Sequence, residues 1–152
     1  MENSCLKRRG RIKTGAAFGM EKLGANTDSA VYVANVTDYT KANYTFNVLR
    51  DATPNHEFGG NWTVFQRRFY GSVDFNRSWA QHRDGFGNVR GEHWLGLEKL
   101  KFLLNSGRHE LLVVLEDFDG VIAYAKYDDF VVGSEAENYT LKSLGNDGLL
   151  DP

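Results

Sequence analysis

The sequence predicts an α+β fold, mainly a twisted antiparallel sheet with two short helices. Short runs rich in β-branched and aromatic residues recur along the chain, while only two segments have a helical character. The dipeptide Asp119-Gly120, set between two apolar runs, is a strong hairpin signal. With 152 residues, 41% of them hydrophobic, the chain is long enough for one globular domain with a substantial core.

We expect three regions along the chain. Residues 1–28 are polar and basic without a sustained period, which predicts a disordered basic tail; the domain occupies residues 29–145, and residues 146–152 form an irregular tail. The domain begins with strands at Ala30–Val36 and Tyr44–Leu49. A loop over Asp51–Gly60 follows, and then a strong strand at Asn61–Phe69.

Two helices are expected in the middle of the chain. The first fits Arg77–Asp84, with Asp74 or Asn76 as its N-cap and Gly85-Phe86-Gly87 as its end. The second fits Gly96–Ser106 and is followed by Gly107. Its apolar face is formed by leucines at positions i, i+3 and i+7, namely Leu97, Leu100 and Leu104.

The last third of the domain is predicted to consist of strands. Glu110–Phe118 is apolar on both alternating faces, which predicts a strand buried on both sides. After the hairpin turn, Val121–Tyr127 is the return strand, and Phe130–Val132 continues it beyond the aspartate pair. A final strand fits Tyr139–Leu144.

Charge and cysteine content give little indication of a special partner. The net charge of −2 indicates neither nucleic acid nor a membrane surface as a partner. Residues 7–13, KRRGRIK, could bind heparin or nucleic acid or direct nuclear import, but a solvated chain end explains them more simply. Cys5 is the one cysteine, so we expect a free thiol and no intrachain disulfide. We see neither a signal peptide nor a stretch of transmembrane length.

The glycosylation motif Asn-X-Ser/Thr is more frequent than chance predicts. It occurs five times, whereas random placement of the same residues gives about one occurrence. This excess suits an extracellular glycoprotein, although some of these asparagines could serve the fold instead. The candidate acceptors are Asn35, Asn43, Asn61, Asn76 and Asn138.

No pattern of catalytic residues is evident. The four histidines have no partner at the spacing of a metal site, and no glycine-rich loop has the phosphate-binding pattern. The acidic pairs Glu116-Asp117 and Asp128-Asp129 are explained by a hairpin turn and a strand edge, without the facing carboxyls of a glycosidase. Asp117–Gly120 weakly matches the start of a calcium loop, and a hairpin is the better interpretation. We therefore expect no enzyme and no metal site.

Seven glycine- and aromatic-rich motifs follow one another along the chain. They are GGNWTVFQRR at 59–68, GSVDF at 71–75, GFGN at 85–88, GEHWLGL at 91–97, LEDFDG at 115–120, YAKY at 124–127 and GSEAENY at 133–139. In this order they resemble the motifs of the fibrinogen-related domain, the globular recognition module of fibrinogen, ficolins, tenascins and angiopoietins. The resemblance runs from about Ser29 to Gly145, and the sequence is most similar to secreted fibrinogen-related lectins of invertebrate type. We interpret the tryptophans within and near these motifs, Trp62, Trp79 and Trp94, as core anchors.

The resemblance implies a non-catalytic, extracellular recognition module. The family suggests lectin-like binding of microbial glycans or acetylated groups in innate immunity. The alternatives are a signalling or structural ligand that binds a receptor or matrix protein, as angiopoietins and tenascins do, or a truncated paralogue without binding. Arg50 stands where the family has a disulfide cysteine. The family's calcium site, second disulfide and ligand pocket belong to a C-terminal part beyond this sequence, so we expect no cofactor and assign no ligand-binding residue.

Overall fold

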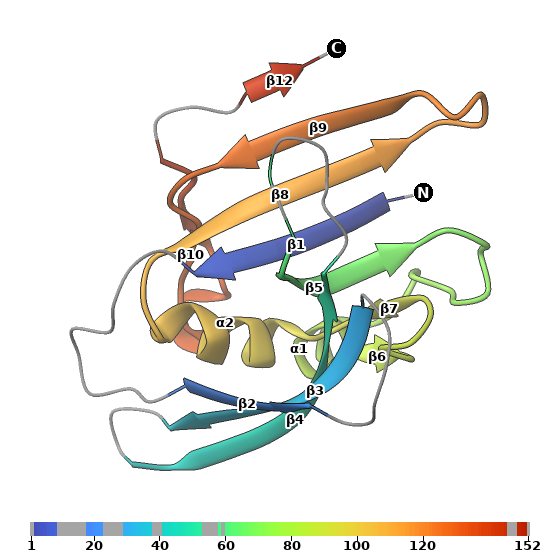
Figure 1. The fold of residues 1–152 in the computed structure, drawn as a ribbon. Helices are drawn as coiled ribbons and strands as arrows, with labels where there is room; N and C mark the ends of the chain where they lie inside the picture. Colours follow the sequence, from blue (N-terminus) through green and yellow to red (C-terminus); the bar gives the residue numbers. More distant parts are fainter. Residues whose placement is uncertain are drawn as a thin grey trace.

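The computed structural model describes residues 2–8, 18–22, 29–37, 41–52, 58, 60–145 and 149–151. Over these ranges the chain forms a ten-stranded antiparallel sheet, a small two-stranded sheet, two α-helices and one 3-10 helix (Figure 1). The expected α+β class, a mainly antiparallel sheet with two short helices, is confirmed.

The elements follow the chain in a mostly meandering order. The large sheet contains β1 (Glu2–Arg8), β2 (Phe18–Lys22), β3 (Ser29–Thr37), β4 (Asn43–Asp51), β5 (Trp62–Arg68), β6 (Phe86–Gly87), β7 (His93–Trp94), β8 (His109–Glu116), β9 (Ile122–Tyr127) and β12 (Leu149–Asp151). The main strand order is β12-β9-β8-β1-β5-β4-β3-β2, and β6 and β7 continue from β5. The small sheet pairs β10 (Val131–Val132) with β11 (Leu141–Ser143), and the helices are α1 (Trp79–Asp84), α2 (Leu97–Asn105) and η2 (Glu135–Glu137).

The strand expected at Glu110–Phe118 lies inside the sheet as β8, and its return strand β9 runs alongside. The two pair from Leu111 with Tyr127 to Glu116 with Ile122. The Asp117 carboxylate accepts the backbone N–H groups of Asp119 and Val121, both at 2.9 Å, and Gly120 adopts a positive φ of 79°. The aspartate and the glycine thus hold the predicted hairpin turn.

The predicted terminal tails are wrong where the structure describes them. Glu2–Arg8 forms β1, which pairs with β5 on one side and β8 on the other. Phe18–Lys22 pairs with β3, and Leu149–Asp151 pairs with β9. A strand bonded on both sides satisfies its backbone N–H and C=O groups whatever its side chains are. The polar composition of residues 2–8 therefore gave no signal of this position.

Three local expectations also change. Helix α1 begins at Trp79 with Ser78 as its N-cap, because Ser78 and Gln81 form a reciprocal capping box. Strand β8 is buried through its first half only, and Leu115 is 48% exposed. Strand β10 does not extend β9 but turns away to pair with β11.

Helix α2 packs between the β3–β4 part of the sheet and the β5–β8 part (Figure 1). Its buried face consists of Leu100, Leu103 and Leu104 and belongs to the larger core cluster. The second cluster, built from β3, β4, β5 and β8, contains Val31, Leu49, Trp62, Val64 and Leu112.

The three tryptophans differ in burial. Trp62 is fully buried, Trp94 is half-buried, and Trp79 is 49% exposed. The core-anchor interpretation is therefore confirmed for Trp62 and wrong for Trp79, because α1 has no buried residue.

Two glycines, Gly85 directly after α1 and Gly96 directly before α2, let the backbone at these two positions approach closely. A Cβ added to Gly85 would lie 2.2 Å from the Leu95 carbonyl oxygen, and one added to Gly96 would lie 2.7 Å from the Asp84 carbonyl carbon. Both glycines have positive φ, 96° and 108°. These positions exclude any side chain on two grounds, backbone conformation and contact with neighbouring backbone.

We expect Gly96→Ala to lower the free energy of unfolding by more than about 2 kcal/mol, because it adds a backbone clash to the cost of a positive φ. Gly120→Ala is the matched control, since Gly120 has a φ of 79° but nothing within 4 Å of an added Cβ. It should cost only about 1–2 kcal/mol. Urea unfolding of the two variants measures the difference, and equal losses would contradict the close-approach explanation.

Candidate functional site

A groove lies between β4 and the segment that contains α1, β6 and α2. It consists of two adjoining pockets of 240 and 330 Å³, which share Phe46 and Lys99 as lining residues. The first is further lined by Asn47, Gly85, Phe86, Gly87, Val89, His93, Trp94 and Leu95, and the second by Tyr44, Thr45, Asp84, Glu98 and Phe102. Together they are in the size range of ligand-binding clefts.

Strand β4 supplies one wall of the groove. Alternation along the strand places Tyr44 and Phe46 on its inner face, where the Tyr44 ring stacks on Phe102 of α2 with centroids 3.7 Å apart. Strand β4 pairs with β3 along its whole length but with β5 only over Leu49–Asp51. Among the strands that the structure describes, none pairs with residues 45–47 on the side away from β3, so this part of β4 presents a strand edge beside aromatic side chains.

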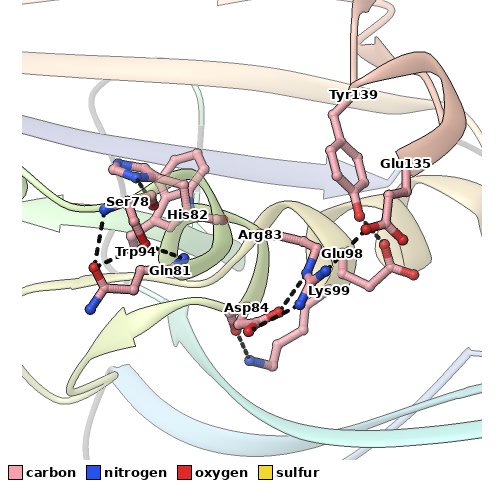
Figure 2. A network of polar contacts seen from close by, with 10 residues as sticks. All are labelled: Ser78, Gln81, His82, Arg83, Asp84, Trp94, Glu98, Lys99, Glu135 and Tyr139. Atoms are coloured by element: carbon pink, nitrogen blue, oxygen red, sulfur yellow. Dashed lines mark hydrogen bonds and ion pairs between the residues drawn. The ribbon is translucent and has the colours of Figure 1, made fainter.

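The opposite wall carries charged groups from α1 and α2. Lys99 Nζ donates a hydrogen bond to the backbone oxygen of Asp84 at 2.6 Å, and Figure 2 shows its side chain reaching across to the end of α1. Burial lowers the pKa of the Lys99 amine below its ordinary value. The groove thus offers one cation among aromatic surfaces.

A polar network joins this wall to η2 and to the residues that follow it (Figure 2). The Arg83 guanidinium bridges the carboxylates of Asp84, at 2.8 Å, and Glu135 of η2, at 3.1 Å. The Tyr139 hydroxyl donates to the Glu98 carboxylate. These bonds connect α1 and α2 to the η2 segment, with partners 52 and 41 residues apart in the sequence.

The same contacts shift several pKa values in the directions their chemistry predicts. The hydrogen bond from Arg83 lowers the pKa of the Asp84 carboxyl, and Arg83 is correspondingly held in its charged form. Burial, and then the bond to Glu98, raise the pKa of the Tyr139 hydroxyl. Arg83 and Asp84 therefore remain charged, and the Tyr139 hydroxyl remains neutral, through the neutral pH range, which suits a structural role.

The predicted glycosylation acceptors are spread over the molecule and do not meet at the groove. Asn35 lies in β3 and is half-buried, while Asn43, Asn61, Asn76 and Asn138 are exposed. Asn61 and Asn138 have positive φ values of 67° and 52°. Asn76 precedes the N-cap of α1 instead of being the cap.

The described residues show no group of three or more His, Cys, Asp or Glu side chains placed to hold a metal ion. His93 is 1% exposed, its ring nitrogens face the carbonyl oxygens of Gly91 and Val64, and burial lowers its pKa. His56 lies outside the described residues. In the part of the chain that the structure describes, no helix is both long and apolar enough to cross a membrane.

Sequence reasoning did not single out the groove residues Tyr44, Phe46, Lys99 and Phe102. Two aromatic residues at alternate positions of one strand were the available signal for Tyr44 and Phe46. The sequence could not predict that α2 packs beside β4, because this packing depends on contacts between segments more than fifty residues apart.

Comparison with known proteins matches residues 19–150 to the family model of the C-terminal globular domain of fibrinogen beta and gamma chains. Angiopoietin-4 of Bos taurus is 41% identical over 131 residues, 85% of this chain and 24% of the relative. Human fibrinogen C domain-containing protein 1 is 46% identical over 111 residues, 73% of this chain and 23% of the relative. Mouse microfibril-associated glycoprotein 4 is 49% identical over 92 residues, 57% of this chain and 36% of the relative.

Solved structures agree. The fibrinogen-like globe domain of human ANGPTL2 aligns with a TM-score of 0.68 at 41% identity, covering 79% of this chain and 53% of that one. Lamprey fibrin D-dimer, solved with the peptide ligand Gly-His-Arg-Pro-amide, aligns with a TM-score of 0.65 at 33% identity, covering 81% of this chain and 38% of that one. The chain thus spans about a quarter to a third of the curated relatives and about half of the solved globe domain.

Proposed function

Because the chain belongs to the family of fibrinogen C-terminal globular domains, we propose that it is a non-catalytic extracellular recognition module whose groove binds an extended segment of a partner protein. The observation that supports this most directly is the strand edge of β4 beside an aromatic wall. An extended peptide can add to such an edge by main-chain hydrogen bonds, and neighbouring pockets then select its side chains.

The relatives are compatible with a protein partner. The lamprey fibrin structure contains a peptide ligand, and the name of the mouse relative associates it with microfibrils. These associations are stated for the lamprey and mouse proteins. For this chain, a receptor or matrix protein is the class of partner that the groove suits best.

Carbohydrate binding is the second candidate, and a different surface favours it. Trp79 is 49% exposed, its ring lies 6.1 Å from that of Tyr139, and the Arg83 guanidinium lies 6.0 Å above it. An exposed indole beside a hydrogen-bond donor is suited to stacking against a sugar ring. Binding of microbial glycans or acetylated groups in innate immunity would then use Trp79 and not the groove.

To test the main proposal, the full chain is used to select short linear peptides from a displayed library, and the enriched peptides are titrated against variants. We expect Phe46→Ala to weaken binding about tenfold or more, since Phe46 lines both pockets. Phe118→Ala is the matched control, because Phe118 is a fully exposed aromatic residue in the β8–β9 turn. Thermal unfolding of each variant verifies that the fold is intact.

A glycan array probed with the same chain separates the two candidates. Peptides that bind wild type and the Phe46→Ala variant equally would contradict recognition by the groove. Glycan binding lost with Trp79→Ala but kept with Phe46→Ala would support the second candidate instead.

A further inference from the structure

Two of the five glycosylation motifs face each other across neighbouring strands. In the β3–β4 register, Asn35 is opposite Thr45 and Thr37 is opposite Asn43. Asn35-Val36-Thr37 and Asn43-Tyr44-Thr45 are both complete motifs, so each asparagine pairs with the threonine of the other motif.

Because side chains alternate between the two faces of a strand, the asparagines and threonines lie on the face away from the core. Ala34 and Val36 of β3 are buried, and Tyr44 and Phe46 of β4 pack toward α2. The intervening positions hold the two asparagines and two threonines, which share the outer face of the sheet. This outer face lies opposite the aromatic wall of the groove.

The side chains form two reciprocal hydrogen bonds. Thr37 Oγ1 donates to Asn43 Oδ1 at 2.7 Å, and Thr45 Oγ1 donates to Asn35 Oδ1 at 3.1 Å. Both bonds use the amide oxygen of the asparagine. Among the described residues, neither amide nitrogen donates a hydrogen bond, so the Nδ2 atoms remain available at the surface.

We propose that Asn35 and Asn43 both carry N-linked glycans, and that the folded hairpin retains its cross-strand bonds when they do. In the reaction, Asn Nδ2 forms a bond to the anomeric carbon of an oligosaccharide supplied by a lipid diphosphate donor. The lipid diphosphate leaves, and the amide nitrogen gives up one hydrogen as a proton. Oδ1 keeps its lone pairs, so it still accepts the threonine hydroxyl.

The paired arrangement has a consequence for recognition. Residues diagonal to each other across an antiparallel pair lie about 7–8 Å apart, so two glycans at these positions cover one continuous surface. A macromolecular partner is then excluded from the outer face of β3–β4. The groove side of the same strands stays open.

The test translates the full chain, behind a cleavable leader, in a cell-free system containing endoplasmic-reticulum microsomes. Because sugar transfer here does not depend on recovery of secreted protein, occupancy can be measured for every variant. Removal of glycans by an amidase in heavy-oxygen water, followed by mass spectrometry of peptides, marks each used asparagine. We expect both Asn35 and Asn43 to be modified, with loss of only the Asn43 glycan in Thr45→Val and its retention in Thr45→Ser.

A second readout tests the reciprocal bonds. In unglycosylated protein, Thr45→Val should lower the melting temperature while Thr45→Ser restores it, because only serine keeps the hydroxyl that Asn35 accepts. The same comparison is made in an Asn43→Gln background, where Asn35 is the remaining acceptor of the hairpin in both Thr45 variants. There the glycosylated and the unglycosylated proteins should both show this hydroxyl-dependent difference. An unmodified Asn35 or Asn43 in the microsome product would overturn the proposal, as would a glycosylated protein whose melting temperature does not respond to loss of the hydroxyl.

Discussion

Replacing Glu92 by glutamine is expected to destabilise the domain strongly and to remove much of its stability loss in acid. The Glu92 side chain is 3% exposed and accepts five hydrogen bonds from the loop that follows β5. Oε1 accepts the backbone N–H groups of Phe69, Tyr70 and Gly71 at 2.6–2.9 Å, and Oε2 accepts Ser72 Oγ and the N–H of Val73 at 2.5 and 3.0 Å. Glutamine would place an NH₂ group against donors at one of these positions.

The pH dependence follows from the same bonds. They hold the pKa of Glu92 well below its ordinary value, with the Ser72 hydroxyl as the largest contribution. The folded carboxylate therefore adds stability above the unfolded pKa of about 4.3, and this stability declines as pH falls below that value. Urea unfolding at several pH values measures both effects. A wild-type curve that is flat from pH 7 to pH 3, or a Glu92→Gln variant as stable as wild type at pH 7, would refute this role.

Trp62→Ala is expected to lower the free energy of unfolding by about 3–5 kcal/mol, since it leaves a large cavity at the centre of the second core cluster. A loss of this size is a large part of the 5–15 kcal/mol typical of a whole domain. Trp79→Ala is the matched control: it removes the same side chain from a half-exposed position and should cost about 1 kcal/mol. Equal losses in urea unfolding would mean that the two tryptophans are not buried as described.

The sequence predicted those elements that its side-chain pattern determines. The strands β3, β4, β5, β8 and β9 and helix α2 combine a local signal with burial of apolar side chains. The Asp117–Gly120 turn is exposed and was predicted from its Asp-Gly dipeptide. Strand β1 was missed because its place in the sheet rests on backbone pairing with β5 and β8. No amphipathic pattern of the segment itself reports such pairing.

The role of Glu92 and the two proposed surfaces, the groove and the glycosylated face, were harder to predict for a similar reason. Glu92 stood within a motif that carried the family resemblance, yet its role depends on donors 19 to 23 residues earlier in the chain. The groove depends on the stacking of the Tyr44 ring of β4 on the Phe102 ring of α2. The glycosylation motifs were found individually, but their pairing across β3 and β4 required the strand register.

Whether the edge of β4 binds an extended peptide is tested most directly by hydrogen exchange of the amides of residues 45–47, with and without a peptide selected by the full chain. If the peptide adds to the edge of β4, those amides in this segment that do not pair with β3 should exchange more slowly in its presence. The hairpin turn at Asp117–Gly120 should be unaffected. Slower exchange confined to that turn or to β9, with residues 45–47 unchanged, would show that the groove is not the recognition site.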